Sequence, residues 1–165
     1  MIVGFLAHEF GVRWGMGDFL TPQRRSAMMA RIRAKDTKPE LTVRQYLFRC
    51  GFRFRIHDKR LPGTPDIVLP KYRTVIFVHG CFWHGHHGCT HFRLPSSHVD
   101  FWRAKILRNR ERDQEHLDRL ESLSWRVIVV WECELRNKSI REATLHGLVN
   151  EIWEVPRDAN RNRGD

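Results

Sequence analysis

The chain has 165 residues and a formal net charge of +10, with 29 lysines and arginines against 19 acidic residues. This length suits one domain with one hydrophobic core, and no run of about eighteen apolar residues indicates a membrane span. The basic balance excludes no fold but favours a polyanionic partner, nucleic acid above all. Because the apolar start of the chain lacks the basic flank of a signal peptide, we expect a cytoplasmic protein.

The N-terminal region is expected to hold an arm followed by a basic helix. Residues 1–20 show no sustained period and contain scattered glycines, which predicts a poorly ordered arm. Thr21 and Pro22 have the types found at the N-cap and first position of a helix, which predicts a helix over residues 21–35. Met29 lies on its apolar side.

A second helix is predicted from Thr37 and Glu40, which have the spacing of a capping box. It should end near Arg49, with Gly51 in the left-handed position that closes a helix. The residues expected to face the core are Leu41, Tyr46, Leu47 and Phe48. From spacing alone Glu40 is a capping residue, although an acid at a helix start can also face a site.

Three extended segments are predicted next. Residues 52–57 alternate strictly, which predicts a half-buried strand with Phe52, Phe54 and Ile56 inward. Residues 66–69 and 74–78 are short apolar runs, close enough in sequence to form a hairpin.

The last part of the chain is expected to add a helix, a strand and a helix. Residues 98–122 read as a long helix, capped by Ser96 or Ser97. Its expected inward residues are Phe101, Ile106, Leu117 and Leu120. Residues 125–131 form a continuous apolar strand of the kind buried at the centre of a sheet. A capping box at 139–142 opens the last helix.

These elements predict a mixed α/β sheet with helices on its faces, in one domain over residues 21–155. Residues 156–165 are charged and are expected to form a flexible tail.

Cysteine and histidine gather in one short stretch. Four residues separate Cys81 from His86, and two separate His86 from Cys89, which suits half of a structural zinc site. Cys133 follows an apolar strand and is the candidate for the fourth ligand. His87 could replace His86, since spacing does not decide between them.

A second group suits hydrolysis. Asp66 begins a strand directly after a proline, and carboxylate oxygen is the ligand that Mg²⁺ prefers. His84 or His79 could act as the base that activates water, and Asp113 could orient an imidazole.

The chain contains the stretches LPGTPD, VIFVHGCFWHGHHGC, DFW, ERD and WRVIVVWEC. On these motifs it resembles the very short patch repair (Vsr) DNA mismatch endonucleases over residues 21–154. The resemblance implies a variant of the PD-(D/E)xK nuclease fold with a mixed central sheet and a structural zinc. It also implies a Mg²⁺-dependent enzyme that nicks duplex DNA 5′ to the thymine of a T:G mismatch, leaving 5′-phosphate and 3′-hydroxyl.

The resemblance also implies residue roles. Asp66 matches the metal-binding aspartate, His84 the histidine that activates water, Asp113 its paired acid, and Glu40 an acidic helper. The residues that match the zinc ligands are Cys81, His86, Cys89 and Cys133. The residues that match those inserted into DNA are Phe82, Trp83, Trp102 and Met29.

The chain departs from a family relative at two places. Val78 stands where that relative has threonine, but the residue offers Mg²⁺ its main-chain oxygen, which valine retains. The tract 83–89 is one residue longer. No lysine of the PD-(D/E)xK pattern is evident after the second strand, and His84 would take over part of its role.

The expected partner is duplex DNA with a T:G mismatch, and repair-pathway proteins are possible further partners. We expect the protein to be a monomer associated with the bacterial nucleoid. The alternative is a zinc-stabilised DNA-binding protein without nuclease activity.

Overall fold

The computed structural model describes residue 24 and residues 35–154. The predicted arm over 1–20, the helix segment that carries Met29 and the tail over 156–165 lie outside the described residues. Their predicted structures stay predictions, and so does the single domain over residues 21–155.

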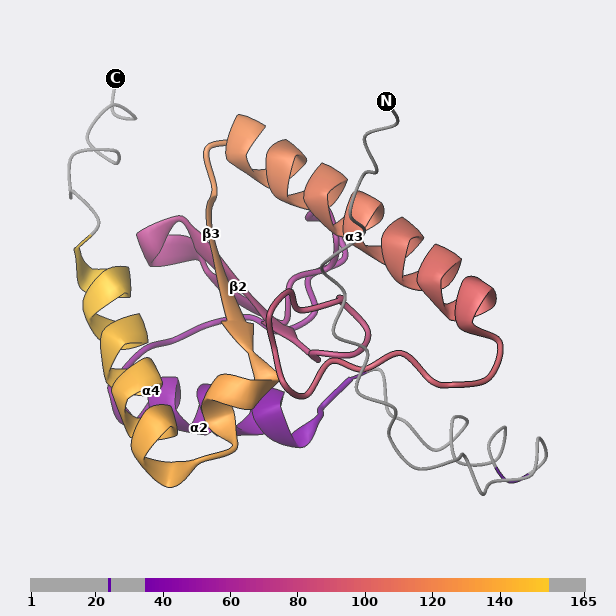
Figure 1. The fold of residues 1–165 in the computed structure, drawn as a ribbon. Helices are drawn as coiled ribbons and strands as arrows, with labels where there is room; N and C mark the ends of the chain where they lie inside the picture. Colours follow the sequence, from indigo (N-terminus) through magenta and orange to yellow (C-terminus); the bar gives the residue numbers. More distant parts are fainter. Residues whose placement is uncertain (1–23, 25–34, 155–165) are drawn as a thin grey trace, which may run out of the picture.

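A three-stranded mixed sheet lies at the centre of the described chain (Figure 1). β1 (Ile67–Leu69) and β2 (Thr74–His79) pair antiparallel and are joined by the 3-10 turn η1 (Pro70–Tyr72), which confirms the hairpin. β2 pairs in parallel with β3 (Arg126–Trp131), and the connection between them is α3 (Val99–Ser122). The mixed α/β class is confirmed. The central position predicted for β3 is wrong, because the strand order is β1-β2-β3 and β2 is flanked on both sides.

Helices cover both faces of this sheet (Figure 1). α2 (Lys38–Arg49) and α4 (Lys138–Trp153) pack on one face and α3 packs on the other. Strand residues alternate between the two cores because successive side chains point to opposite faces. The first core includes Ile67, Leu69, Ile76, Ile128 and Val130, and the second includes Val68, Val75, Phe77 and Leu120.

The start and end of α2 agree with the sequence, but its buried face does not. Thr37 and Glu40 form the predicted capping box, and Gly51 has the predicted left-handed φ of +86°. Leu41 and Phe48 are exposed, and Val43 and Leu47 are buried instead.

The predicted strand over residues 52–57 forms only one bridge. Arg55 and Val68 exchange two backbone hydrogen bonds of 2.9 and 2.8 Å. Phe52 is buried as expected, but Ile56 is 48% exposed. His57 has a φ of +48°, which turns the chain out of the extended conformation directly after Ile56.

The remaining helices depart from prediction at their starts and faces. His98 occupies the N-cap of α3 without a side-chain cap, and Trp102 is buried where Phe101 was expected. Asn137 caps α4, accepting from the Ser139 N–H at 2.9 Å, so the predicted capping box there is wrong. Within the described residues, no helix combines the length and apolarity needed to cross a membrane.

Candidate active site

The directions of the strands place the predicted site residues at one edge of the sheet. β2 and β3 are parallel, with His79 paired to Trp131, so the loops that follow both strands begin side by side. β1 runs antiparallel to β2, so Asp66, directly before β1, lies beside the end of β2. Residues that are far apart in the sequence therefore meet at this edge of the sheet.

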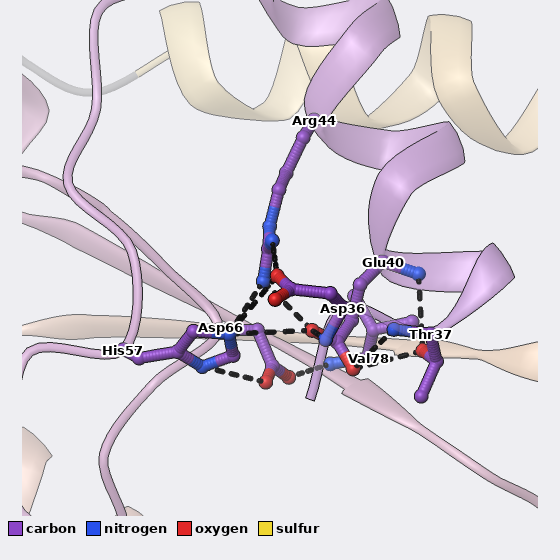
Figure 2. A network of polar contacts seen from close by, with 7 residues as sticks. All are labelled: Asp36, Thr37, Glu40, Arg44, His57, Asp66 and Val78. Carbon is purple, nitrogen blue, oxygen red and sulfur yellow. Dashed lines mark hydrogen bonds and ion pairs between the residues drawn. The ribbon is translucent and has the colours of Figure 1, made fainter. Parts of the chain in front are cut away.

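Asp66 is held against the backbone of β2. The Val78 N–H donates to its Oδ2 at 2.7 Å, and His57 Nδ1 lies 3.8 Å from its Oδ1 (Figure 2). Burial raises the pKa of the Asp66 carboxyl, with the Val78 hydrogen bond acting in the opposite direction. A carboxylate raised in energy by burial gains more from a bound cation. The Val78 main-chain oxygen stays a predicted ligand.

His84, in the loop after β2, is paired with Asp113 of α3. His84 Nδ1 lies 2.5 Å from Asp113 Oδ2. Burial raises the pKa of Asp113, but the hydrogen bond and charge of His84 more than compensate, so the pKa of this carboxyl is lowered overall. An ionised carboxylate only accepts hydrogen bonds, so Nδ1 carries a proton and Nε2 is left to act on other groups.

His79 is the second candidate base, and its surroundings differ. Its ring stacks on that of His84 with centroids 3.8 Å apart. Burial, and then repulsion by His84 when His84 is protonated, lower the pKa of His79 to about 3. His79 therefore stays neutral at physiological pH, and the nearby Asp113 carboxylate is hydrogen-bonded to His84.

One cleft of about 910 Å³ brings these residues together. Glu40, Asp66, His84 and Asp113 all line it, although they come from α2, the start of β1, the loop after β2, and α3. The predicted reactive residues therefore share a concave site large enough for part of an extended polymer.

Glu40 has two roles in this arrangement. It completes the cap of α2, accepting from the Thr37 hydroxyl at 2.8 Å. It also accepts from Arg44 at 2.7 Å (Figure 2), and it lines the cleft. The capping and site-facing readings of Glu40 are thus both compatible with the structure.

The predicted metal-ligating quartet gathers beside the cleft. One atom each of Cys81, His86, Cys89 and Cys133 lies within 4.8 Å of the others. His86 Nδ1 is 3.6 Å from Cys81 Sγ and 3.5 Å from Cys133 Sγ, whereas His87 is exposed and outside the group. Geometry therefore favours His86 as the ligand.

These distances fit a tetrahedral zinc site. Bonds of about 2.3 Å to sulfur and about 2.0 Å to nitrogen separate the two ligand atoms by about 3.5 Å at tetrahedral angles. Burial raises the pKa of the Cys81 thiol to about 12, so a cation is needed to stabilise its thiolate. Four protein ligands would leave no open position.

The aromatic residues predicted to insert into DNA form one cluster with unequal exposure. The ring of Phe82 lies 5.1 Å from Trp83 and 5.3 Å from Trp102. Phe82 and Trp83 are half-buried, whereas Trp102 is only 7% exposed. Trp102 therefore supports the other two rings in this structure, and its own contact with DNA stays a prediction.

Sequence reasoning missed three residues that shape the site. Arg44 and His57 contact Glu40 and Asp66, respectively. Asn109 donates to the Trp83 carbonyl at 2.9 Å and ties the loop after β2 to α3. A glutamate and an arginine four residues apart on a helix gave a signal for the Arg44 contact. The other two contacts join residues far apart in the sequence and left no local pattern.

Comparisons with known proteins agree with the resemblance. A family model described as DNA mismatch endonuclease Vsr matches residues 17–91. Type II nicking enzyme V.NmeAIP of Neisseria meningitidis is 53% identical over 137 residues, covering 83% of this chain and 97% of that protein. Type II nicking enzyme V.XorIIP of Xanthomonas oryzae pv. oryzae is 51% identical over 135 residues, covering 82% and 98%.

DNA mismatch endonuclease Vsr of Escherichia coli (strain K12) is 46% identical over 123 residues, covering 74% of this chain and 78% of that protein. The similarity extends over most of both chains in each comparison. This chain therefore belongs to the Vsr family of DNA mismatch endonucleases.

Proposed function

We propose that this protein is a Mg²⁺-dependent endonuclease that nicks duplex DNA 5′ to the thymine of a T:G mismatch. The observation that carries the proposal is the meeting of Asp66 with the His84–Asp113 pair in one cleft. The names of the relatives support the reaction class, since they are called nicking enzymes or a mismatch endonuclease.

The residues of the cleft suit hydrolysis of a phosphodiester. Asp113 holds His84 with Nδ1 protonated, so that Nε2 can take a proton from water as the water attacks phosphorus. As the bond from the water oxygen to phosphorus forms, the P–O3′ bond breaks, and the leaving 3′-oxygen takes a proton from solvent water, which leaves a 3′-hydroxyl and a 5′-phosphate. Asp66, with the Val78 main-chain oxygen, would hold Mg²⁺, which supplies stabilisation of the charge that develops on the phosphate.

The cysteine–histidine quartet is assigned a structural zinc. The loop that supplies Cys81, His86 and Cys89 also carries His84 and Trp83. A closed site of this kind contributes folding free energy and fixes the loop. The chemistry of the cleft would depend on it indirectly, through the position of His84.

Mismatch recognition is assigned to the aromatic cluster. Trp83 lines the cleft and packs against Phe82, and Lys105 lies near the Trp83 ring. Met29 is assigned as a further residue that inserts from the minor groove. Inserting side chains between base pairs costs a few kcal/mol of unstacking, and a mismatched pair resists less. Insertion would therefore favour a T:G site. We expect a monomer acting on bacterial DNA, with repair-pathway proteins following the nick.

The test uses zinc-loaded protein and duplex oligonucleotides labelled on either strand. With Mg²⁺, we expect one nick, in the T-containing strand of the T:G duplex, and none in the matched T:A duplex. Asp66→Asn is the control, because asparagine keeps an acceptor for the Val78 N–H while removing the charge. Nicking should fall by more than about a thousandfold, or about 4 kcal/mol.

Folded wild-type protein that binds the T:G duplex but never nicks it with Mg²⁺ would contradict the proposal. That result would favour a zinc-stabilised DNA-binding protein instead.

A further inference from the structure

An ion-pair network that is buried at Arg44 and Glu40 joins α2 to the start of β1 (Figure 2). Arg44 Nη1 donates to Asp36 Oδ1 at 2.5 Å, and Nη2 donates to Glu40 Oε2 at 2.7 Å. The same Nη2 lies 2.9 Å from His57 Nε2. The opposite nitrogen of His57 faces Asp66 Oδ1 at 3.8 Å, so the network reaches the predicted Mg²⁺ ligand.

This network exceeds what capping of α2 requires. Thr37 and Glu40 form the capping box without Arg44. The side chain of Arg44 is only 9% exposed, and that of Glu40 is 4% exposed. Taking a guanidinium out of water costs several kcal/mol unless its partners compensate. A buried arginine is therefore a costly choice if its only function were to cover the surface of the helix.

The groups around Arg44 could otherwise bind a metal ion. Asp36, Glu40 and His57 each offer one ligand atom, and these atoms lie within 4.8 Å of one another. Carboxylate oxygens bind Mg²⁺ and Mn²⁺, and a neutral imidazole can add a nitrogen. Arg44 nitrogens lie within hydrogen-bonding distance of all three residues and supply the positive charge there.

We propose that Arg44 is a built-in cation that keeps divalent ions out of the Asp36–Glu40–His57 group and directs the ion in the cleft to Asp66. Arg44 is then a positioning residue: it fixes the Glu40 carboxylate and never touches the reacting atoms. The guanidinium is suited to this because its fork of donors holds two carboxylates at once and stays charged. The inference rests on the proposed function, which makes Asp66 the Mg²⁺ ligand.

The test measures binding of Mn²⁺ alone, by electron paramagnetic resonance, to zinc-loaded protein without DNA. Asp66→Asn should lose Mn²⁺ binding. Adding Arg44→Met to Asp66→Asn should restore one bound Mn²⁺, at an affinity at least about tenfold above that of Asp66→Asn. Adding Glu40→Gln as well should abolish that site. A folded Arg44→Met, Asp66→Asn protein that gains no Mn²⁺ would overturn the inference.

Arg44→Lys in the Asp66→Asn background is the matched control. Lysine keeps the positive charge but not the fork, so it should exclude Mn²⁺ as arginine does. A Mn²⁺ site that appears with lysine as readily as with methionine would contradict the role of charge.

A third variant covers the case in which Arg44→Met does not fold. The Asp36 side chain is 54% exposed, so Asp36→Asn should fold. With Arg44 in place, the Mn²⁺ affinity of Asp36→Asn should stay within about twofold of the wild type. A loss of about tenfold or more would show that Asp36 binds the ion despite Arg44, and the inference would fail.

These outcomes separate the inference from the function that it deepens. If Asp66→Asn alone keeps wild-type Mn²⁺ binding and nicking, the assignment of Asp66 is wrong. The Arg44 inference is tested separately, because it fails if replacing Arg44 creates no Mn²⁺ site.

Discussion

The cysteine–histidine quartet and the acidic cleft lie at the same edge of the sheet but are built differently. Three of the four quartet residues fall within one short loop, whereas the cleft draws Glu40, Asp66, His84 and Asp113 from four segments. The quartet offers a complete set of soft ligands, and the cleft offers oxygen, imidazole and open space. The quartet is therefore mostly local in sequence, whereas the cleft is assembled by the fold.

The two regions are joined by shared elements. The loop after β2 supplies Cys81 and His86 to the quartet and His84 to the cleft. Trp131 stacks on His86 at 3.9 Å and meets the edge of His79 at 5.3 Å. A change in the quartet should therefore disturb the cleft, whereas a change in the cleft should leave the quartet intact.

The largest effect is expected from Cys133→Ser, because it removes the quartet residue that comes from outside the loop after β2, in the 3-10 turn η2 (Glu132–Leu135) that follows β3. Zinc content should fall, the thermal unfolding midpoint should drop, and nicking should be lost with the fold of the loop. Zinc analysis and thermal melts measure this directly. Cys50→Ser is the control, because Cys50 lies outside the quartet and this variant should retain its zinc. Full zinc content and an unchanged melt in Cys133→Ser would break the distinction between the two regions.

The next effect concerns the two stacked histidines. His84→Gln should lower the rate of nicking by about 10²–10⁴-fold while zinc content stays unchanged, because a general base is lost. His79→Gln should lower the rate less, since His79 is buried and neutral and the Asp113 carboxylate is hydrogen-bonded to His84. Single-turnover rates on the T:G duplex measure both. A larger loss in His79→Gln than in His84→Gln would reverse the assignment.

A smaller effect separates Trp83, which is proposed to insert into DNA, from Trp102, which supports it. Trp83→Ala should weaken cleavage of the mismatched duplex by about 1–3 kcal/mol, the value of one base–aromatic stack, and change stability by less than about 1 kcal/mol. Trp102→Ala should instead destabilise the fold by about 3–5 kcal/mol, since Trp102 is buried. Denaturant melts beside cleavage assays compare the two. Equal destabilisation by both would make Trp83 a core residue.

The smallest effect is a pH dependence of the Mg²⁺ requirement. In the proposed mechanism only the ionised Asp66 binds Mg²⁺, and burial raises its pKa above the usual 3.8. Protonation therefore competes with Mg²⁺ at a higher pH than for an exposed aspartate, and the Mg²⁺ concentration for half-maximal nicking should rise as pH falls. Mg²⁺ titrations at several pH values between about 4.5 and 7 measure this. A constant requirement down to the lowest pH would remove the role of Asp66.

Local signals predicted much of this molecule. The β1–β2 hairpin, the capping box of Thr37 and Glu40 and the left-handed Gly51 depend on neighbours in the sequence, and all three are confirmed. The spacing of Cys81 and Cys89 likewise identified a group that the fold does bring together.

Features set by distant contacts were predicted less well. The position of β3 depends on which strands pair, and its apolar run gave no information on that. Trp102 is buried and Phe101 exposed because the rings of the loop after β2 pack on one side of α3 only. The ion pairs of Arg44 with Asp36 and its contact with His57 require a bend at His57 that its residue type does not signal.

The most direct test of the division between the two regions is to remove the metals in steps. Purified protein should contain one zinc per chain, and brief treatment with EDTA should abolish nicking of the T:G duplex while the zinc remains. Adding Mg²⁺ alone should restore full activity. Active protein without zinc, or activity restored by zinc but not by Mg²⁺, would contradict a structural quartet beside a magnesium-dependent cleft.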